Sequence, residues 1–280
     1  LDASDFEARQ WLPHSGWPIC KADLDPYAAA ADEILEVKPH IDARPATRDI
    51  DFIQFRFSTP VRFGTKYRAE IEKSRTVGLL LNTAVKELVP GDGRIDSITL
   101  VERSHKEQDL PVENVCVCTG GIENSRLLLW SNARYKGRVV PHADTLGRYW
   151  MEQPLQMIGD AITFNGYEMQ FESRTPEKWY FAPSERAKRA YAIGGSHIWL
   201  RAHSENPNKV KALWQEATCL APTLSNRLLK LVNREYVCGA EIHAEIEQAP
   251  QADNRIELGR TVDAFGVPRS RLFWKKSDAE

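Results

Sequence analysis

Two adjacent glycines, Gly120 and Gly121, have the residue type and the position that best suit ligand binding. Residues 115–118 before them form a short apolar run, typical of a strand buried on both faces, and apolar side chains after them recur at helical spacing. Glycines at such a join let the chain turn sharply and let a ligand approach the backbone. The N–H groups that open the helix suit an anionic group. The pattern indicates either a dinucleotide contact or glycines that serve packing alone.

A second candidate site lies on a strand near the end of the chain. Between residues 241 and 247 polar and apolar residues alternate, so one strand face carries three glutamates and a histidine. Carboxylates beside a histidine are the material of acid–base chemistry, whereas many charged strand faces are only solvated. We select His243 as a candidate substrate contact. The polar set is Glu241, His243, Glu245 and Glu247.

Aromatic residues and cysteines offer less specific signals. Trp179, Tyr180 and Trp199 can line a pocket the size of a sugar ring, because aromatic faces stack on pyranose rings, or they can be ordinary core. Cys116 and Cys118 fall inside the apolar run and predict two buried thiols rather than a metal site, which would need a second pair of ligands. We expect no metal. No nucleophile elbow supports a hydrolase.

The composition excludes two large classes of protein. Charged residues make up 27% of the 280, the formal net charge is −2 and the mean hydropathy is −0.45, values unlike those of disordered or membrane-spanning chains. Basic residues are scattered among acidic ones, so nucleic-acid binding has no support. Five widely spaced cysteines fit a reducing compartment, and we expect the cytoplasm. The first residue is Leu1 and no signal peptide follows, which suggests an internal piece of a longer protein.

Hydrophobic periodicity predicts an α/β part beside an α+β part. The turn Gly91-Asp92-Gly93 suits a hairpin, because glycine tolerates positive φ. After Pro154 most segments alternate as strands of an antiparallel sheet do. Ser4 and Glu7 suit a capping box for a short helix that runs to Trp11. The other expected helices are residues 25–37, 65–73, 207–217 and 223–233, and the expected strands are 50–57, 77–81, 84–89, 95–102, 115–118, 155–165, 179–182, 192–201, 236–248, 255–258 and 269–274.

The order of these segments resembles that of the glucose-methanol-choline (GMC) oxidoreductases, flavoenzymes that use FAD. The resemblance covers nearly the whole chain. It implies part of a Rossmann-like FAD-binding domain joined to an antiparallel-sheet substrate domain. The implied division is a helical lead-in with part of the substrate domain over residues 1–75, an FAD-binding part over 76–148 and a substrate-binding part over 149–280. The segments that carry it are DFEARQWLPHSGWPI, DLDPYAAAADEILEV, LLLNTAVKEL, VCVCTGGIENSRLLLWSN, LGRYWMEQP and EIEQAPQADNRIELGRTVDAFGVPRSRLFW.

The resemblance implies roles for particular residues. Val85 takes the place of the family's adenine-contacting valine, which acts through backbone groups; without the resemblance it is an ordinary strand valine. Thr119, Gly120 and Gly121 would pass beneath the ADP portion of FAD. Asn124 is a polar side chain near this join and serves either the cofactor or the helix as a local cap.

The implied reaction is oxidation of the CH–OH group of a sugar or polyol, with hydride transfer to the flavin. Gln153 stands where the family usually has a histidine before the proline. Glutamine can hydrogen-bond a substrate hydroxyl but cannot carry a proton near neutral pH, so we assign it to substrate contact only. In the family the G-x-G-x-x-G loop lies upstream of this segment and the catalytic histidine downstream. No catalytic residue is therefore expected within the 280.

The sequence leaves an alternative function open. The chain can instead be a non-catalytic binding or partner subunit that completes the flavin site of another chain. A stand-alone piece of this kind would expose an apolar sheet edge near residues 115–118. The electron acceptor, whether oxygen, a quinone or a protein, is not indicated by any motif.

Overall fold

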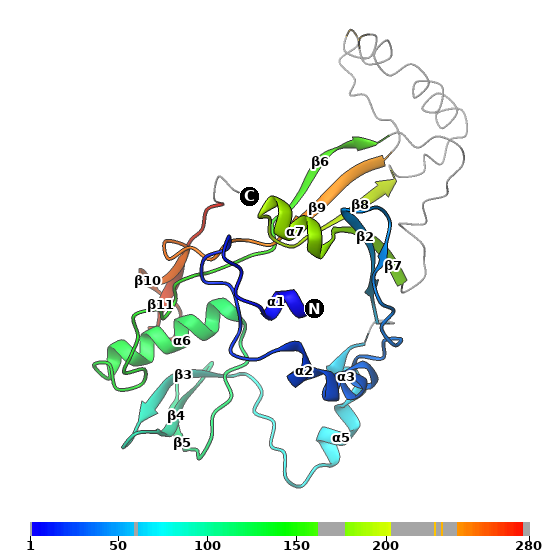
Figure 1. Ribbon diagram of the computed structural model, residues 1–280. Coiled ribbons are helices and arrows are strands. Elements are labelled where there is room, and N and C mark those ends of the chain that lie inside the picture. The colour runs from blue at the N-terminus through cyan, green and yellow to red at the C-terminus, as the bar shows by residue number, and fades with distance from the viewer. Residues whose placement is uncertain are drawn as a thin grey trace. The chain divides into compact units, whose positions relative to one another are not determined.

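The computed structural model describes residues 2–58, 61–161, 177–202, 227, 231 and 240–276. They form two compact units, and each unit is assembled from two separate stretches of the chain (Figure 1). Unit 1 comprises Leu1–Arg62 and Glu152–Ala249, and unit 2 comprises Phe63–Met151 and Pro250–Glu280. Both units contain helices and antiparallel strands, which confirms the mixed class predicted from the sequence.

Unit 1 is built on a six-stranded sheet with the strand order β1-β2-β7-β8-β9-β6. Every neighbouring pair is antiparallel, as the alternation after Pro154 predicts. The first stretch of the chain contributes to this sheet through β2, which pairs with β7. The pairing runs from Ile50 opposite Pro183 to Arg56 opposite Glu177. The strands are β1 (Arg44–Pro45), β2 (Ile50–Arg56), β6 (Leu155–Ala161), β7 (Glu177–Pro183), β8 (Ser196–Ala202) and β9 (Ala240–Ile246).

Short helices complete the described part of unit 1. The first is capped by Asp2, whose N–H donates to the Asp5 carboxylate at 2.7 Å, so the predicted Ser4 and Glu7 capping box is wrong. The helices expected at 207–217 and 223–233 lie outside the described residues, apart from two positions in the second, of which Arg227 is helical. Leu231 is also described and is helical. The helices are α1 (Ala3–Phe6), α2 (Lys21–Leu24), the 3₁₀ helix η1 (Asp25–Tyr27), α3 (Ala28–Leu35) and α7 (Glu185–Tyr191).

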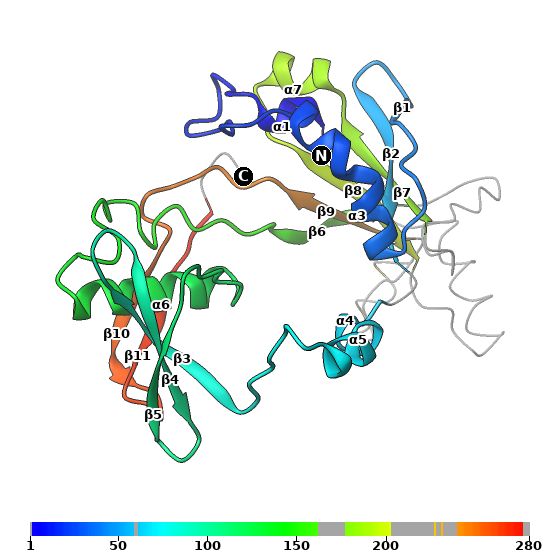
Figure 2. The same ribbon diagram turned by 90° about the horizontal axis from the view of Figure 1, so that it is seen from below.

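Unit 2 contains a three-stranded meander, a β-hairpin and one long helix (Figure 2). The predicted Gly-Asp-Gly turn joins β3 to β4, and Gly93 has a φ of +70°. β10 and β11 pair with each other and belong to the same unit as residues 63–151. The resemblance assigned residues 250–280 to the substrate-binding part, whereas the structure groups them with unit 2. The elements are α4 (Phe63–Lys66), α5 (Arg68–Lys73), β3 (Thr83–Pro90), β4 (Ile95–Glu102), β5 (Glu107–Pro111), α6 (Gly121–Arg134), β10 (Arg255–Val262) and β11 (Pro268–Phe273).

Helix α6 packs on β3 of the meander and on the β10–β11 hairpin. Ser131 on α6 is fully buried, and its Oγ accepts the N–H of Leu88 in β3 at 3.0 Å. Arg126 donates to the carboxylate of Asp263 at 2.5 Å and to the carbonyl oxygen of Pro268 at 2.7 Å. These bonds fix the helix that begins at the glycine pair to both strand systems of unit 2.

Two predicted strands are wrong. Residues 77–81 and 115–118 form no strand, because no strand in the described ranges supplies partners for their N–H and C=O groups. Leu80 and Leu81 are 61% and 69% exposed. Cys116 and Cys118 are exposed as well, so the prediction of two buried thiols is also wrong. The described strand pairings are all antiparallel, and a Rossmann-like FAD-binding domain stays a prediction.

Candidate functional site

The glycine turn is held in shape by a side chain of the helix that follows it. Asn124 accepts two hydrogen bonds at Oδ1, from the N–H of Thr119 at 2.8 Å and from its hydroxyl at 2.7 Å. The Nδ2 atom of Asn124 donates to the carbonyl oxygen of Val117 at 3.1 Å. Asn124 and Thr119 therefore cap the turn locally, which is one of the two roles that the sequence left open for Asn124.

Gly120 and Gly121 are needed at this turn for different reasons. Gly120 has a φ of +87°, which residues with side chains rarely adopt, and apart from its two chain neighbours no described residue has an atom within 4 Å of the position that a Cβ would take. At Gly121 a Cβ would lie 2.8 Å from Cζ3 of Trp150. Packing alone explains Gly121, whereas the open space beside Gly120 lets a ligand reach the backbone.

The start of α6 presents unpaired N–H groups beside this open space. The first intrahelical bond runs from the N–H of Asn124 to the carbonyl oxygen of Gly120 at 2.8 Å, and no side chain in the described part of the chain caps the helix start. Glu123, the acidic residue of the first turn, is paired with Arg126 at 3.0 Å. Its negative charge is thereby partly neutralised, and the helix start suits an anionic group.

Val85 and Gln153 lie in different units. Val85 is on β3, a strand that α6 contacts, and its exposed fraction of 41% sets it apart from an ordinary buried strand valine. Gln153 is exposed and lies just before β6 in unit 1. The structure therefore brings Val85 and the glycine turn into one unit and leaves Gln153 in the other.

The second candidate site is one face of the six-stranded sheet, which we call the aromatic face: Phe55, Tyr180, Trp199 and His243. The strand register places these side chains on the same side, with Trp199 directly opposite His243. Ring centroids are 4.4 Å apart for Phe55 and Tyr180, and 5.3 Å apart for Tyr180 and Trp199. The rings of Trp199 and His243 lie 5.5 Å apart with an interplanar angle of 20°. The four rings form a continuous row across β2, β7, β8 and β9.

Trp179 does not belong to this row. Neighbouring residues of a strand point to opposite faces, so Trp179 and Tyr180 cannot line the same surface. The ring of Trp179 lies 4.4 Å from the guanidinium of Arg44. The sequence grouping of Trp179 with Tyr180 and Trp199 is therefore wrong, and strand alternation alone would have separated them.

Charged groups from β9 flank the row of rings. His243 Nε2 lies 2.7 Å from Oε2 of Glu241, and the two side chains are 14% and 28% exposed. A carboxylate can only accept this hydrogen bond, so Nε2 carries the hydrogen, and an imidazole in its neutral form would present Nδ1 as an acceptor. Burial raises the pKa of the Tyr180 hydroxyl, and the negative charge of Glu245 raises it further. Two of the predicted polar residues therefore act directly on members of the aromatic face.

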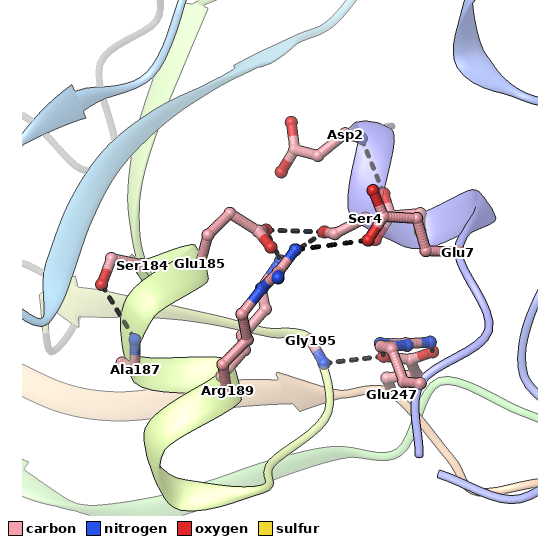
Figure 3. A network of polar contacts seen from close by, with 12 residues as sticks. Asp2, Ser4, Glu7, Ser184, Glu185, Ala187, Arg189, Gly195 and Glu247 are labelled. Carbon is pink, nitrogen blue, oxygen red and sulfur yellow. Dashed lines mark hydrogen bonds and ion pairs between the residues drawn. The ribbon is translucent and has the colours of Figure 1, made fainter. Parts of the chain in front are cut away.

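Glu247, the last member of the predicted polar set, has a structural role (Figure 3). Both of its carboxylate oxygens bind the guanidinium of Arg9, with 2.8 Å between Nη1 and Oε2, and Oε2 also accepts the N–H of Gly195 at 2.7 Å. Nearby, Ser4 of α1 donates to Glu185 of α7 at 2.6 Å. These contacts fix the N-terminal segment to the end of β9 and to α7. No sequence pattern signals the Arg9–Glu247 pair.

No family model matches this chain, and no curated protein is significantly similar to it in sequence. Across the described ranges, no group of three or more His, Cys, Asp or Glu side chains is placed to hold a metal ion. The helices that the structure describes are all too short or too polar to cross a membrane.

Proposed function

We propose that this chain forms part of an FAD-dependent oxidoreductase of the glucose-methanol-choline type, which oxidises the CH–OH group of a sugar or polyol. In this proposal unit 2 supplies part of a Rossmann-like FAD-binding domain, and unit 1 supplies the substrate-binding part. The order of the resembling segments along the chain supports the assignment. So does the separation of the glycine turn and the antiparallel sheet into two compact units.

The observation that carries the proposal is the uncapped start of α6 beside the open space at Gly120. Gly120 and the backbone of Gly121 would hold the ADP portion of FAD, and the backbone of Val85 would hold the adenine. Thr119 and Asn124 would act indirectly, because their mutual hydrogen bonds set the shape of the turn. FAD, when bound, supplies the hydride acceptor.

His243 and Gln153 are the substrate contacts that we propose for unit 1. His243 offers Nδ1 as an acceptor for a substrate hydroxyl, because Glu241 occupies Nε2. The exposed amide of Gln153 can both donate to and accept from a hydroxyl. Both residues orient the donor carbon, and the group that removes the hydroxyl proton is a histidine from outside these 280 residues.

An anaerobic absorption spectrum tests the function. The purified product of the complete reading frame should show flavin bands that bleach when one member of a panel of sugars and alcohols is added. A Gly120→Ala variant should lower the flavin content, and Gly137→Ala is the matched control, because Gly137 also has a positive φ of +84° and open space around it. A colourless, folded protein that takes up no added FAD would contradict the proposal.

The second candidate is a non-catalytic partner subunit that completes the flavin site of another chain. Exposed apolar side chains at Val77 and at residues 79–81 favour a surface that a further segment covers. If that segment belongs to the same reading frame, with a G-x-G-x-x-G upstream and a histidine segment downstream, the enzyme is supported. Flavin uptake only after a second polypeptide is added would support the subunit.

A further inference from the structure

Two free thiols, Cys116 and Cys118, lie in the segment of unit 2 that leads into α6, and both are exposed. Exposure alternates along this segment, because Val115 and Val117 are only half-buried positions between exposed ones. An alternation with a period of two residues is that of an extended backbone, so the two thiols point to the same side. The chain therefore presents a pair of sulfur atoms to solvent.

The backbone on both sides of Cys118 is anchored to the helix that follows. The carbonyl oxygen of Val117 accepts a hydrogen bond from Nδ2 of Asn124 at 3.1 Å, and the N–H of Thr119 donates to Oδ1 of the same side chain at 2.8 Å. Asn124 belongs to α6, which is itself fixed to β3 through Ser131. A ligand that joins the two thiols therefore needs to order less of the chain, which favours binding.

The extended backbone holds the two thiols too far apart for a disulfide between them. Two residues of an extended chain advance by about 6.4–6.8 Å, and side chains on one side start from Cβ atoms with a similar separation. A disulfide needs Cβ atoms about 3.5–4.5 Å apart. An ion between two thiolates relaxes this limit, because two metal–sulfur bonds of about 2.3 Å each allow about 4.6 Å between the sulfur atoms. The pair is better suited to hold a bridging ion than to close on itself.

The number and the softness of the ligands select the kind of ion. Structural zinc takes four ligands, and among the described residues no group of three or more His, Cys, Asp or Glu side chains could hold a metal ion. Copper(I) is a soft ion that prefers thiolate sulfur, and two thiolates in a linear arrangement satisfy it. The sequence argued against a four-coordinate metal ion at these cysteines, which leaves a two-coordinate ion open.

We propose that Cys116 and Cys118 bind one copper(I) ion between their thiolates. On binding, each thiol releases its proton, two sulfur–copper bonds form and the copper keeps its +1 charge, so no oxidant or reductant is consumed. The site goes beyond the proposed function, because it requires neither flavin nor sugar.

Anaerobic titration of the 280-residue chain with copper(I), in competition with a colorimetric copper(I) chelator, tests this site. Cys219 and Cys238 are replaced by serine throughout, so that only the described cysteines compete. This parent chain should withdraw one copper(I) ion from the chelator. Cys116→Ser and Cys118→Ser should each weaken copper(I) binding at least about a hundredfold, because a single thiolate loses the advantage of a second ligand on the same chain.

Cys20→Ser is the matched control. Cys20 is also free and exposed, but no second described cysteine lies beside it in the sequence, so its replacement should leave copper(I) binding unchanged. X-ray absorption at the copper edge should show two sulfur neighbours, and circular dichroism checks that each variant is folded. Equal affinity of the parent chain and folded Cys116→Ser, or three or more sulfur neighbours, would overturn the site.

The outcome separates this site from the oxidoreductase proposal. Copper(I) binding that depends on both cysteines, in a protein whose complete reading frame takes up no FAD, would support the site and contradict the enzyme. Maleimide labelling of the product of the complete reading frame should modify both thiols. Flavin that bleaches with a sugar, in a product whose Cys116 and Cys118 resist maleimide, would support the enzyme and overturn the site.

Discussion

Replacing Glu247 with glutamine should loosen the N-terminal segment from the sheet of unit 1. Glutamine keeps the size of the side chain and can still accept the N–H of Gly195, so the change removes mainly the charge that faces Arg9. The Nε atom of Arg9 is already buried and has no hydrogen-bond partner among the described residues. A guanidinium in that position depends on the carboxylate to offset its desolvation.

The expected loss follows from the burial of the two partners. The side chain of Arg9 is 6% exposed and that of Glu247 is 33% exposed. Removing one partner of a fully buried pair costs about 3–5 kcal/mol, and an exposed pair contributes about 0–1 kcal/mol. Because one partner is buried and the other is partly solvated, Glu247→Gln should lower the stability of this contact by about 2 kcal/mol.

Hydrogen exchange at Trp11 measures this loss locally. The indole N–H of Trp11 donates to the carbonyl oxygen of Ile193 at 3.0 Å, so its exchange rate reports detachment of the N-terminal segment. A local probe is preferable because two units can unfold in separate steps. A loss of about 2 kcal/mol corresponds to roughly thirtyfold faster exchange.

The control is Glu7→Gln, which removes a comparable but exposed ion pair. Glu7 and Arg189 are 3.3 Å apart, with side chains 56% and 63% exposed. This change should alter exchange at Trp11 by less than a factor of about two or three, because exposed pairs contribute little. Equal effects of Glu247→Gln and Glu7→Gln would refute the argument from burial.

Three further predictions concern packing and pH. Gly121→Ala should destabilise unit 2 by about 1–3 kcal/mol in thermal unfolding, because the new Cβ would stand 2.8 Å from Trp150, and an unchanged midpoint would contradict this. Ser131→Ala should cost about 1–3 kcal/mol in urea unfolding, because it leaves a buried N–H of β3 unpaired, and a smaller loss would mean that another group accepts this N–H. Burial by itself raises the pKa of Glu247, but hydrogen bonds from Arg9 and a backbone N–H lower it below its ordinary value of 4.5. The stabilisation from this pair should be complete above about pH 4.5 and lost as the pH falls further, and unfolding titrations should show this acid sensitivity in the wild type but not in Glu247→Gln.

The sequence predicted strands well where the strand has a neighbour within the described residues and buries one of its faces, because such strands alternate between polar and apolar residues. The segment that became β9 alternates because Ala244 faces the core at 3% exposed while His243 lies on the other face. The same reasoning failed at residues 115–118, where an apolar composition indicated a buried strand. An apolar, β-branched composition indicates only that a segment favours the extended conformation. To form a strand, its N–H and C=O groups also need hydrogen-bond partners on a neighbouring strand.

Long-range ion pairs could not be predicted from local patterns. Arg9 and Glu247 are 238 residues apart, and Arg126 and Asp263 are 137 residues apart. Each arginine looks like a solvated surface residue in its own segment, because burial is decided by elements that arrive from elsewhere in the chain. The glycine turn was more accessible to sequence reasoning, because its determinants lie within residues 117–124.

The division of each unit between two stretches determines the order in which the protein can fold during synthesis. Residues 63–151 leave the ribosome before any of residues 250–276 exist, so Arg126 must wait for Asp263. Unit 1 can be completed first, but only after β9 has been made, since β9 is the last strand of its described sheet and lies between β8 and β6. A premature stop before residue 240 would therefore release no folded half: β6 would lose its only neighbour among the described strands, and Arg9 would lose its carboxylate.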